Sequence, residues 1–148
     1  MITNIRNFLY DVNIIKPYVS KSYVISIGNI IAGGTGKTPI IIHIAELLKK
    51  EGYKVGIITG GYRRKSKGLL VVHDVGKLST TVDKAGDEAF LVAKKLRVPL
   101  LIHDKKYKAL KDLDSFFDVD IVLVDDGFHR TPKTRISTKN STDVLKLQ

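Results

Sequence analysis

A run of glycines followed by a lysine and a threonine carries the clearest chemistry in this sequence. The run reads Gly33, Gly34, Thr35, Gly36, Lys37 and Thr38. Glycines lack a Cβ, so such a loop can turn several backbone N–H groups toward one anion. The lysine adds a positive charge at the β- and γ-phosphates, and the threonine hydroxyl is a ligand for Mg²⁺. The run therefore predicts a binding site for ATP and Mg²⁺.

The full eight-residue form of this phosphate-binding motif begins with glycine, whereas this chain has Ile31 at that position. The other positions match, and they lie between a β-rich segment at 23–27 and a helical pattern, which is the order such loops require. We assign nucleotide binding to the whole octet: Ile31, Ala32, Gly33, Gly34, Thr35, Gly36, Lys37 and Thr38. A tight turn that happens to contain a lysine is the alternative interpretation.

Two carboxylates at the end of an apolar segment are the candidate metal ligands. Residues 119–124 are mostly β-branched and lead directly into Asp125 and Asp126. Apart from Asp120 the segment is apolar, and a continuous apolar stretch such as 121–124 is typical of a strand at the centre of a parallel sheet, buried on both faces. A carboxylate at the end of such a strand, beside a phosphate-binding loop, can hold Mg²⁺. We expect Thr38, Asp125 and Asp126 at the metal, and the sequence does not decide which acid touches it.

A basic segment follows another predicted strand. The strand is expected at 54–59, and Tyr62, Arg63, Arg64 and Lys65 come after a pair of glycines. In open parallel sheets, ligands bind beyond the carboxyl ends of the strands. The segment is therefore either a solvated loop or a second phosphate clamp, and these four residues are the candidate substrate-binding residues.

Strands and helices alternate along the chain. Strands are expected at 23–27, 54–59, 69–73, 99–102 and 119–124, and helices between residues 38 and 52, at 85–96 and at 104–113. A polar connection without an element is expected at 74–84. This alternation predicts an α/β fold of the P-loop NTPase type, with a mostly parallel sheet flanked by helices.

Both ends of the chain differ from this pattern. Residues 1–17 contain an amphipathic helical pattern that Pro17 ends, and its apolar stripe can pack on the domain or lie on a membrane surface. The nucleotide-binding domain is expected to span 18–130. Residues 131–148 have no periodicity apart from a hint of an element near 144–147, so we expect a poorly ordered tail.

The composition is that of an ordinary globular domain. The 148 residues contain no cysteine, which excludes disulfides, thiolate metal sites and thiol nucleophiles. No segment has the length of a membrane span or the core of a signal peptide. The net charge of +10 indicates an anionic partner without choosing among nucleotide, nucleic acid and lipid headgroup. Aromatic residues are only 7% and form no array for base stacking, so nucleic acid is not expected.

Four segments together resemble one family, the tetraacyldisaccharide 4'-kinases of lipid A biosynthesis in Gram-negative bacteria. They are residues 6–11, residues 24–39 with the glycine-rich loop, residues 61–68 with the basic segment, and the pair formed by Gly86, Asp87 and Glu88 with Asp125, Asp126, Gly127 and Phe128. Their order and spacing cover residues 5–130. Each segment alone is weak evidence for the family, whereas the four together are specific to it.

The resemblance implies ATP-dependent phosphoryl transfer to the 4'-hydroxyl of a tetraacyldisaccharide 1-phosphate. It implies Asp87 as the catalytic base, with Lys37 and Mg²⁺ neutralising charge on the phosphates. It also implies a cytoplasmic location, peripheral on the inner membrane. The N-terminal helix would then lie on the bilayer, where the enzyme meets its lipid A precursor.

The chain departs from the family in several places. It has Thr59 and Gly60 where the family has serine and arginine, Ala89 in place of a proline, and one residue fewer after Phe128. Members of the family also have a second lobe, which this chain does not contain. We therefore expect a large internal deletion or a truncated product. Two alternatives to a working kinase follow: a nucleotide-binding remnant without turnover, and a partitioning-type P-loop ATPase.

Overall fold

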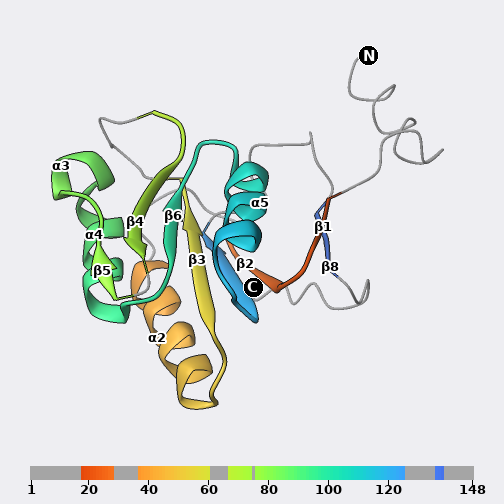
Figure 1. Cartoon of the computed structure of the whole chain (residues 1–148). Coiled ribbons are helices and arrows are strands. Elements are labelled where there is room, and N and C mark those ends of the chain that lie inside the picture. Colours follow the sequence, from red (N-terminus) through yellow and green to blue (C-terminus); the bar gives the residue numbers. More distant parts are fainter. Residues whose placement is uncertain (1–17, 29–36, 61–66, 75, 126–135, 139–148) are drawn as a thin grey trace.

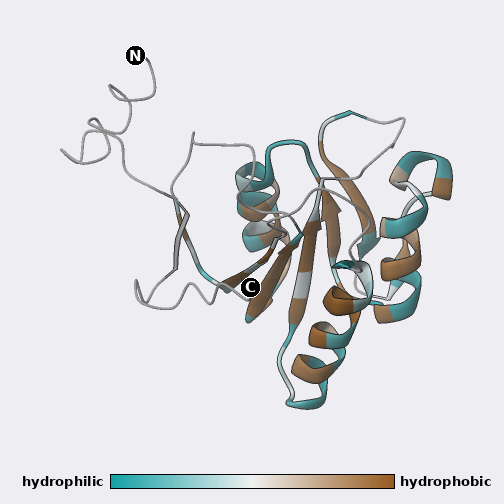
Figure 2. Ribbon diagram, turned by 180° about the vertical axis from the view of Figure 1, so that it is seen from behind, coloured by the Kyte–Doolittle hydropathy of each residue, from teal (hydrophilic) through white to brown (hydrophobic). Residues whose placement is uncertain are grey.

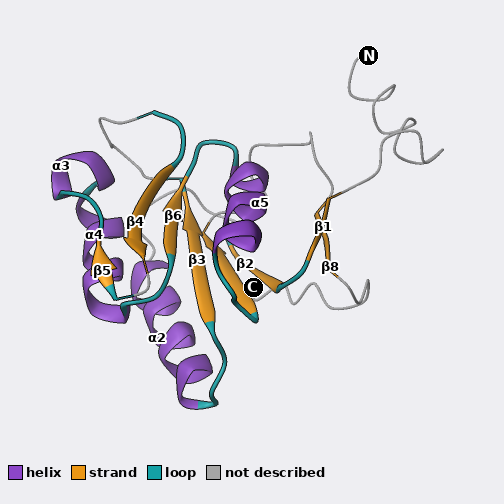
Figure 3. Ribbon diagram, in the orientation of Figure 1, coloured by secondary structure: helices purple, strands orange, loops and turns teal. Residues whose placement is uncertain are grey.

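A six-stranded β-sheet with helices on both faces forms the centre of the molecule (Figure 1). The computed structural model describes residues 18–28, 37–60, 67–74, 76–125 and 136–138. In chain order the elements are β1 (Tyr18–Ser20), β2 (Tyr23–Ile27), α2 (Lys37–Lys50), β3 (Val55–Thr59), β4 (Leu70–Asp74), β5 (Lys77–Leu78), α3 (Val82–Ala85), α4 (Asp87–Leu96), β6 (Leu100–Ile102), α5 (Lys106–Phe116), β7 (Ile121–Asp125) and β8 (Ile136–Thr138). Figure 3 shows the alternation of helices and strands, which confirms the predicted α/β class.

The sheet is parallel through its centre and antiparallel at one edge. Its strand order is β2-β7-β3-β6-β4-β5, and β7 pairs in parallel with β2 on one side and β3 on the other. Strand β4 pairs antiparallel with both β6 and β5. The carboxyl ends of β2, β7 and β3 therefore meet at one edge, where folds of this type bind their ligands.

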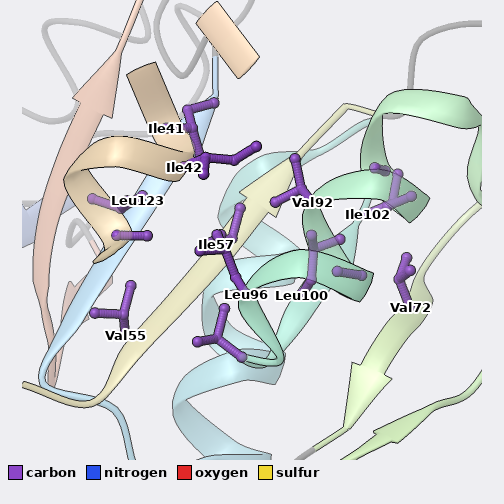
Figure 4. Packing of buried hydrophobic residues seen from close by; sticks show 14 of the residues in the cluster. Ile41, Ile42, Val55, Ile57, Val72, Val92, Leu96, Leu100, Ile102 and Leu123 are labelled. Atoms are coloured by element: carbon purple, nitrogen blue, oxygen red, sulfur yellow. The ribbon is translucent and has the colours of Figure 1, made fainter. Parts of the chain in front are cut away.

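The central strands send alternate side chains into two hydrophobic layers. In one layer, Ile57, Leu100 and Leu123 pack with side chains of α2 and α4 (Figure 4). In the other, Ile58 and Leu101 pack against α5. Figure 2 shows hydrophobic colour along the central strands, whereas the helices carry both hydrophobic and hydrophilic colour. Strand β7 contributes to both layers, which confirms the two-sided burial that its apolar sequence predicts.

Asp114 of α5 accepts hydrogen bonds from the segment 18–22, which precedes β2. Its carboxylate is buried and accepts hydrogen bonds from Tyr18 Oη at 2.6 Å, Ser20 Oγ at 2.9 Å, Lys21 N at 3.1 Å and Ser22 Oγ at 3.0 Å. These donors replace the hydrogen bonds that a buried carboxylate loses from water. Burial, reinforced by the hydrogen bond to Asp114, raises the pKa of Tyr18 well above its ordinary range. The cluster therefore holds β1 and the start of β2 in place.

Three features differ from the sequence predictions. The segment 74–84, predicted to lack an element, contains β5 and the start of α3. The helix predicted at 85–96 begins only at Asp87, because Gly86, with a φ of 87°, separates α3 from α4. The tail contains β8, which pairs in parallel with β1. These elements are two to four residues long, too short to produce a periodic pattern, and β8 and β5 are defined by their backbone partners.

The N-terminal helix predicted within residues 1–17 lies outside the described residues, as do positions 139–148 of the tail. Across the described ranges, no helix combines the length and the apolar character that crossing a bilayer requires.

His73 of β4 is a buried imidazole at the antiparallel side of the sheet. The residue is 2% exposed, and desolvation lowers its pKa below the ordinary value, against the opposing effect of Asp74. The unfolded chain takes up a proton here below about pH 6.5, whereas the folded chain resists protonation until a lower pH. His73 therefore lowers the free energy of unfolding as the pH falls below that value.

We expect His73→Leu to remove this part of the acid sensitivity, because the replacement has no group to protonate. The measurement is the free energy of unfolding in urea at a series of pH values between about 7 and 5. His43→Leu on the exposed side of α2 is the matched control. Its free energy of unfolding should vary with pH as that of the unmodified chain does. If the free energy of unfolding of the His73 variant depended on pH as it does in the unmodified chain, His73 would not be a source of the acid sensitivity.

Candidate functional site

A pocket lies at the carboxyl edge of the sheet, between the strands and helices α2 and α4. Its polar lining consists of Thr38, Thr59, Glu88 and Asp125. Its apolar lining consists of Ile41, Ile57, Ala89, Val92 and Leu100. Four elements, α2, β3, α4 and β7, thus bring hydroxyl and carboxylate groups together against an aliphatic wall. This combination suits a polar ligand whose charged end lies beside the strand ends.

The phosphate-binding motif meets the pocket through α2. Lys37 and Thr38 are the first two residues of that helix, and Thr38 lines the pocket together with Asp125. The first turn of a helix has backbone N–H groups without intrahelical partners and the positive end of the dipole, both of which favour an anion. The helix has no acidic residue in this turn, so no side chain of the turn competes with an anionic ligand.

Asp125 is held on one carboxylate oxygen and has no hydrogen bond on the other. Thr59 Oγ1 donates to its Oδ2 at 3.1 Å, and the Lys106 ammonium donates to its main-chain carbonyl oxygen. The buried Oδ1 receives no hydrogen bond from any residue that the structure describes. Leaving a buried acceptor unsatisfied costs roughly 1–3 kcal/mol, so this oxygen marks a place for a cation or a donor.

The oxygens of Thr38 and Asp125 fit Mg²⁺. Hydroxyl and carboxylate oxygens are ligands that Mg²⁺ prefers, and the unpartnered Oδ1 supplies one of them. Within the described ranges, no group of three or more acidic or imidazole side chains could hold a metal by itself. Mg²⁺ usually keeps several waters and binds one or two carboxylates together with phosphate oxygens. The pair therefore suits an ion that binds together with a nucleotide.

Asp87, the predicted base, is the first residue of α4 and is exposed. Its neighbours Glu88 and Ala89 line the pocket, whereas Asp87 does not. The backbone turn at Gly86 has a φ of 87°, a conformation that residues with a Cβ rarely adopt, and it sets the direction in which α4 begins. The turn therefore brings the Gly-Asp-Glu segment to the edge of the pocket.

Several predicted site residues lie outside the described residues. They are Ile31, Ala32, Gly33, Gly34, Thr35 and Gly36 of the loop, the second acid Asp126, and the basic segment Tyr62, Arg63, Arg64 and Lys65. Their roles stay predictions. Of the predicted metal ligands, Thr38 and Asp125 are brought together.

The site also contains three residues to which the sequence assigned no role: Thr59, Glu88 and Lys106. Thr59 carried a usable signal, because it is a polar residue at the carboxyl end of a predicted strand. Glu88 carried one in its position next to Asp87. Lys106 carried none, because it reaches Asp125 from α5 through tertiary contact alone.

The chain matches the family model described as tetraacyldisaccharide-1-P 4'-kinase over residues 1–133. It belongs to that family. The resemblance inferred from four sequence segments is therefore confirmed. The matched region includes the glycine-rich loop, the Gly-Asp-Glu segment and the acids Asp125 and Asp126.

Relatives of known name agree with this assignment. The tetraacyldisaccharide 4'-kinase of Halothermothrix orenii is 42% identical over 127 residues, which cover 84% of this chain and 33% of the relative. The tetraacyldisaccharide 4'-kinase of Aquifex aeolicus is 41% identical over 135 residues, covering 87% of this chain and 41% of the relative. The chain thus spans less than half of the length of these relatives.

A solved structure also resembles this chain. It is the crystal structure of LpxK from Aquifex aeolicus, described as its "apo" form in complex with ATP, with a TM-score of 0.72 and 36% identity. The similarity covers 93% of this chain and 44% of that chain. The α/β fold of the P-loop NTPase type, predicted from the sequence, is therefore confirmed.

Proposed function

We propose that this chain is the ATP-binding part of a tetraacyldisaccharide 4'-kinase, which transfers a phosphoryl group from ATP to the 4'-hydroxyl of a tetraacyldisaccharide 1-phosphate in lipid A biosynthesis. The observation that carries the proposal is the pocket in which Thr38 and Asp125 meet, with Asp125 Oδ1 lacking a hydrogen bond from the described residues. Family membership supports the identity of the reaction.

The proposed nucleotide site is formed by residues 31–38. Their backbone N–H groups would surround the phosphates, and the ammonium of Lys37 would lie at the β- and γ-phosphates. Thr38 and Asp125, with Asp126 as a further candidate, would hold Mg²⁺. When bound, this ion neutralises charge that develops on the phosphate oxygens during transfer.

The proposed base is Asp87. A carboxylate within hydrogen-bond reach of the sugar hydroxyl would accept its proton as the oxygen attacks the γ-phosphorus and the bond to the β-phosphate oxygen breaks. Two observations support this role: Asp87 is exposed, and the adjacent Glu88 lines the pocket. A base must reach the substrate hydroxyl and release its proton to water, and an exposed carboxylate beside the pocket would be able to do so.

The proposed substrate is an anionic lipid, and two features of the chain support it. The net charge is +10, which favours anionic headgroups. The predicted amphipathic helix within residues 1–17 would lie on the cytoplasmic face of the inner membrane, where such a lipid is found. Tyr62, Arg63, Arg64 and Lys65 are the residues that we propose for contact with the substrate phosphate.

Replacing Lys37 by alanine tests the nucleotide site. We expect ATP to bind roughly 10- to 100-fold more weakly, because a hydrogen bond to a charged group contributes about 1.5–3 kcal/mol. Calorimetric titration with ATP measures the affinity. The control is Lys50→Ala at the other end of α2, which should bind ATP like the unmodified chain. Equal affinity in the Lys37 variant and the unmodified chain would contradict the assigned loop.

A second candidate function is a nucleotide-binding remnant that has lost phosphoryl transfer. This chain matches 33–41% of the length of the two kinases named above, so the assay must establish whether this part alone performs the transfer. The two functions differ in a transfer assay. A remnant binds ATP but forms no 4'-phosphorylated product, whereas a kinase forms that product in an Asp87-dependent reaction.

A further inference from the structure

The hydroxyl of Thr59 is the one side-chain donor described on the carboxylate of Asp125. We propose that Thr59 is a positioning residue for Mg²⁺: it holds Oδ2 of Asp125, so that Oδ1 is the oxygen that binds the ion. This inference rests on the proposed function, because the ion in question is the one bound with ATP.

The sheet register brings the two residues together. Strands β3 and β7 are parallel neighbours, and Ile58 with Val124 is the last pair of their ladder. Thr59 and Asp125 are the next residue of each strand, and paired residues of neighbouring strands point to the same face. Their side chains are joined by the 3.1 Å hydrogen bond from Thr59 Oγ1 to Asp125 Oδ2. The contact is therefore a consequence of the strand pairing.

The main chain of Asp125 is restrained from the opposite layer. Lys106, the first residue of α5, donates its ammonium to the carbonyl oxygen of Asp125. Its side chain passes close to Gly60, where a Cβ would lie 3.7 Å from Lys106 Cε. The end of β7 is therefore fixed at its backbone by α5 and at its side chain by β3.

This arrangement distinguishes the two carboxylate oxygens. Oδ2 is engaged by Thr59, whereas Oδ1 is buried without a hydrogen bond from the described part of the chain. Threonine is β-branched, which limits the χ1 angles open to its hydroxyl. Without that hydroxyl the carboxylate could turn about its terminal bond, and binding Mg²⁺ would require ordering it again. Outer-shell donors of this kind orient metal ligands, and their removal typically costs about 10- to 100-fold in metal affinity.

The test replaces Thr59 by valine, which has nearly the same shape but no hydroxyl. The affinity for a fluorescent non-hydrolysable ATP analogue is measured as a function of Mg²⁺ concentration, and Mn²⁺ binding to the chain with the analogue is measured by electron paramagnetic resonance. We expect the Mg²⁺ concentration at which the gain in analogue affinity is half-maximal to rise about 10- to 100-fold. Affinity for the analogue in EDTA should not change.

Two further variants complete the experiment. Thr59→Ser keeps the hydroxyl and should restore the metal dependence of the unmodified chain. Asp125→Asn removes the ligand charge and should weaken metal binding at least as much as the valine. If Thr59→Val does not fold, Thr59→Ala removes the hydroxyl with a smaller side chain and takes its place.

The outcomes separate the proposal from the function on which it rests. An unchanged metal dependence in Thr59→Val would overturn the positioning role. Equal weakening of analogue binding with and without Mg²⁺, unrescued by serine, would also overturn it, because that pattern indicates a structural effect. Failure of the unmodified chain to bind the analogue would instead overturn the proposed function, and the inference with it.

Discussion

Replacing Asp87 by asparagine is expected to slow phosphoryl transfer by roughly 10²- to 10⁴-fold, the range that general base catalysis contributes. The amide has nearly the shape of the carboxylate but cannot accept the hydroxyl proton. Asp87 is exposed and does not line the pocket, so ATP affinity and folding should change little. The assay follows phosphate from labelled ATP onto a tetraacyldisaccharide 1-phosphate, with calorimetry on the same samples.

The matched control is Asp83→Asn, which alters an exposed acid in the first turn of the neighbouring helix α3. It should transfer phosphate like the unmodified chain. A rate for Asp87→Asn equal to that of the control would rule out Asp87 as the base. ATP binding without any transfer, even in the unmodified chain, would favour the remnant function.

Asp114→Ala is expected to lower the free energy of unfolding by about 3–5 kcal/mol, because hydrogen bonds to a buried carboxylate are lost and their donors are left unpaired. The alanine has no acceptor for Tyr18 Oη, Ser20 Oγ or the backbone N–H of Lys21. Since domains are stable by about 5–15 kcal/mol, the change removes a large share of the total. Urea denaturation measures it.

An exposed acid just after α5 provides the comparison. Asp118 forms an ion pair with Lys54, and both side chains are mostly exposed, at 87% and 61%. Such pairs contribute little, so Asp118→Ala should leave the urea midpoint nearly unchanged. Similar midpoints for Asp114→Ala and Asp118→Ala would show that the buried cluster does not stabilise the fold.

Strong local patterns are the features that the sequence could predict. Residues 23–27 were predicted as a strand and form β2 with those bounds, and the apolar segment before Asp125 forms a strand buried on both faces. The convergence of Thr38 and Asp125 was also predicted, because a motif between a strand and a helix and an acid at a strand end both belong to the carboxyl edge of such a sheet.

Contacts between distant residues are the features that the sequence could not predict. Thr59 and Asp125 are 66 positions apart, and Ser20 and Asp114 are 94 apart. Such pairs depend on strand order and helix placement, neither of which leaves a periodic trace. Asp114 illustrates the limit, since an aspartate within a helix is normally solvated. Its burial follows only from the packing of α5 against β1.

Binding of a triphosphate and Mg²⁺ beside Thr38 and Asp125 is the central claim, and calorimetric titration of the unmodified chain with a non-hydrolysable ATP analogue, in Mg²⁺ and in EDTA, tests it most directly. We expect saturable one-to-one binding in both buffers and clearly higher affinity in Mg²⁺. Absence of saturable binding, or the same affinity in both buffers, would contradict it.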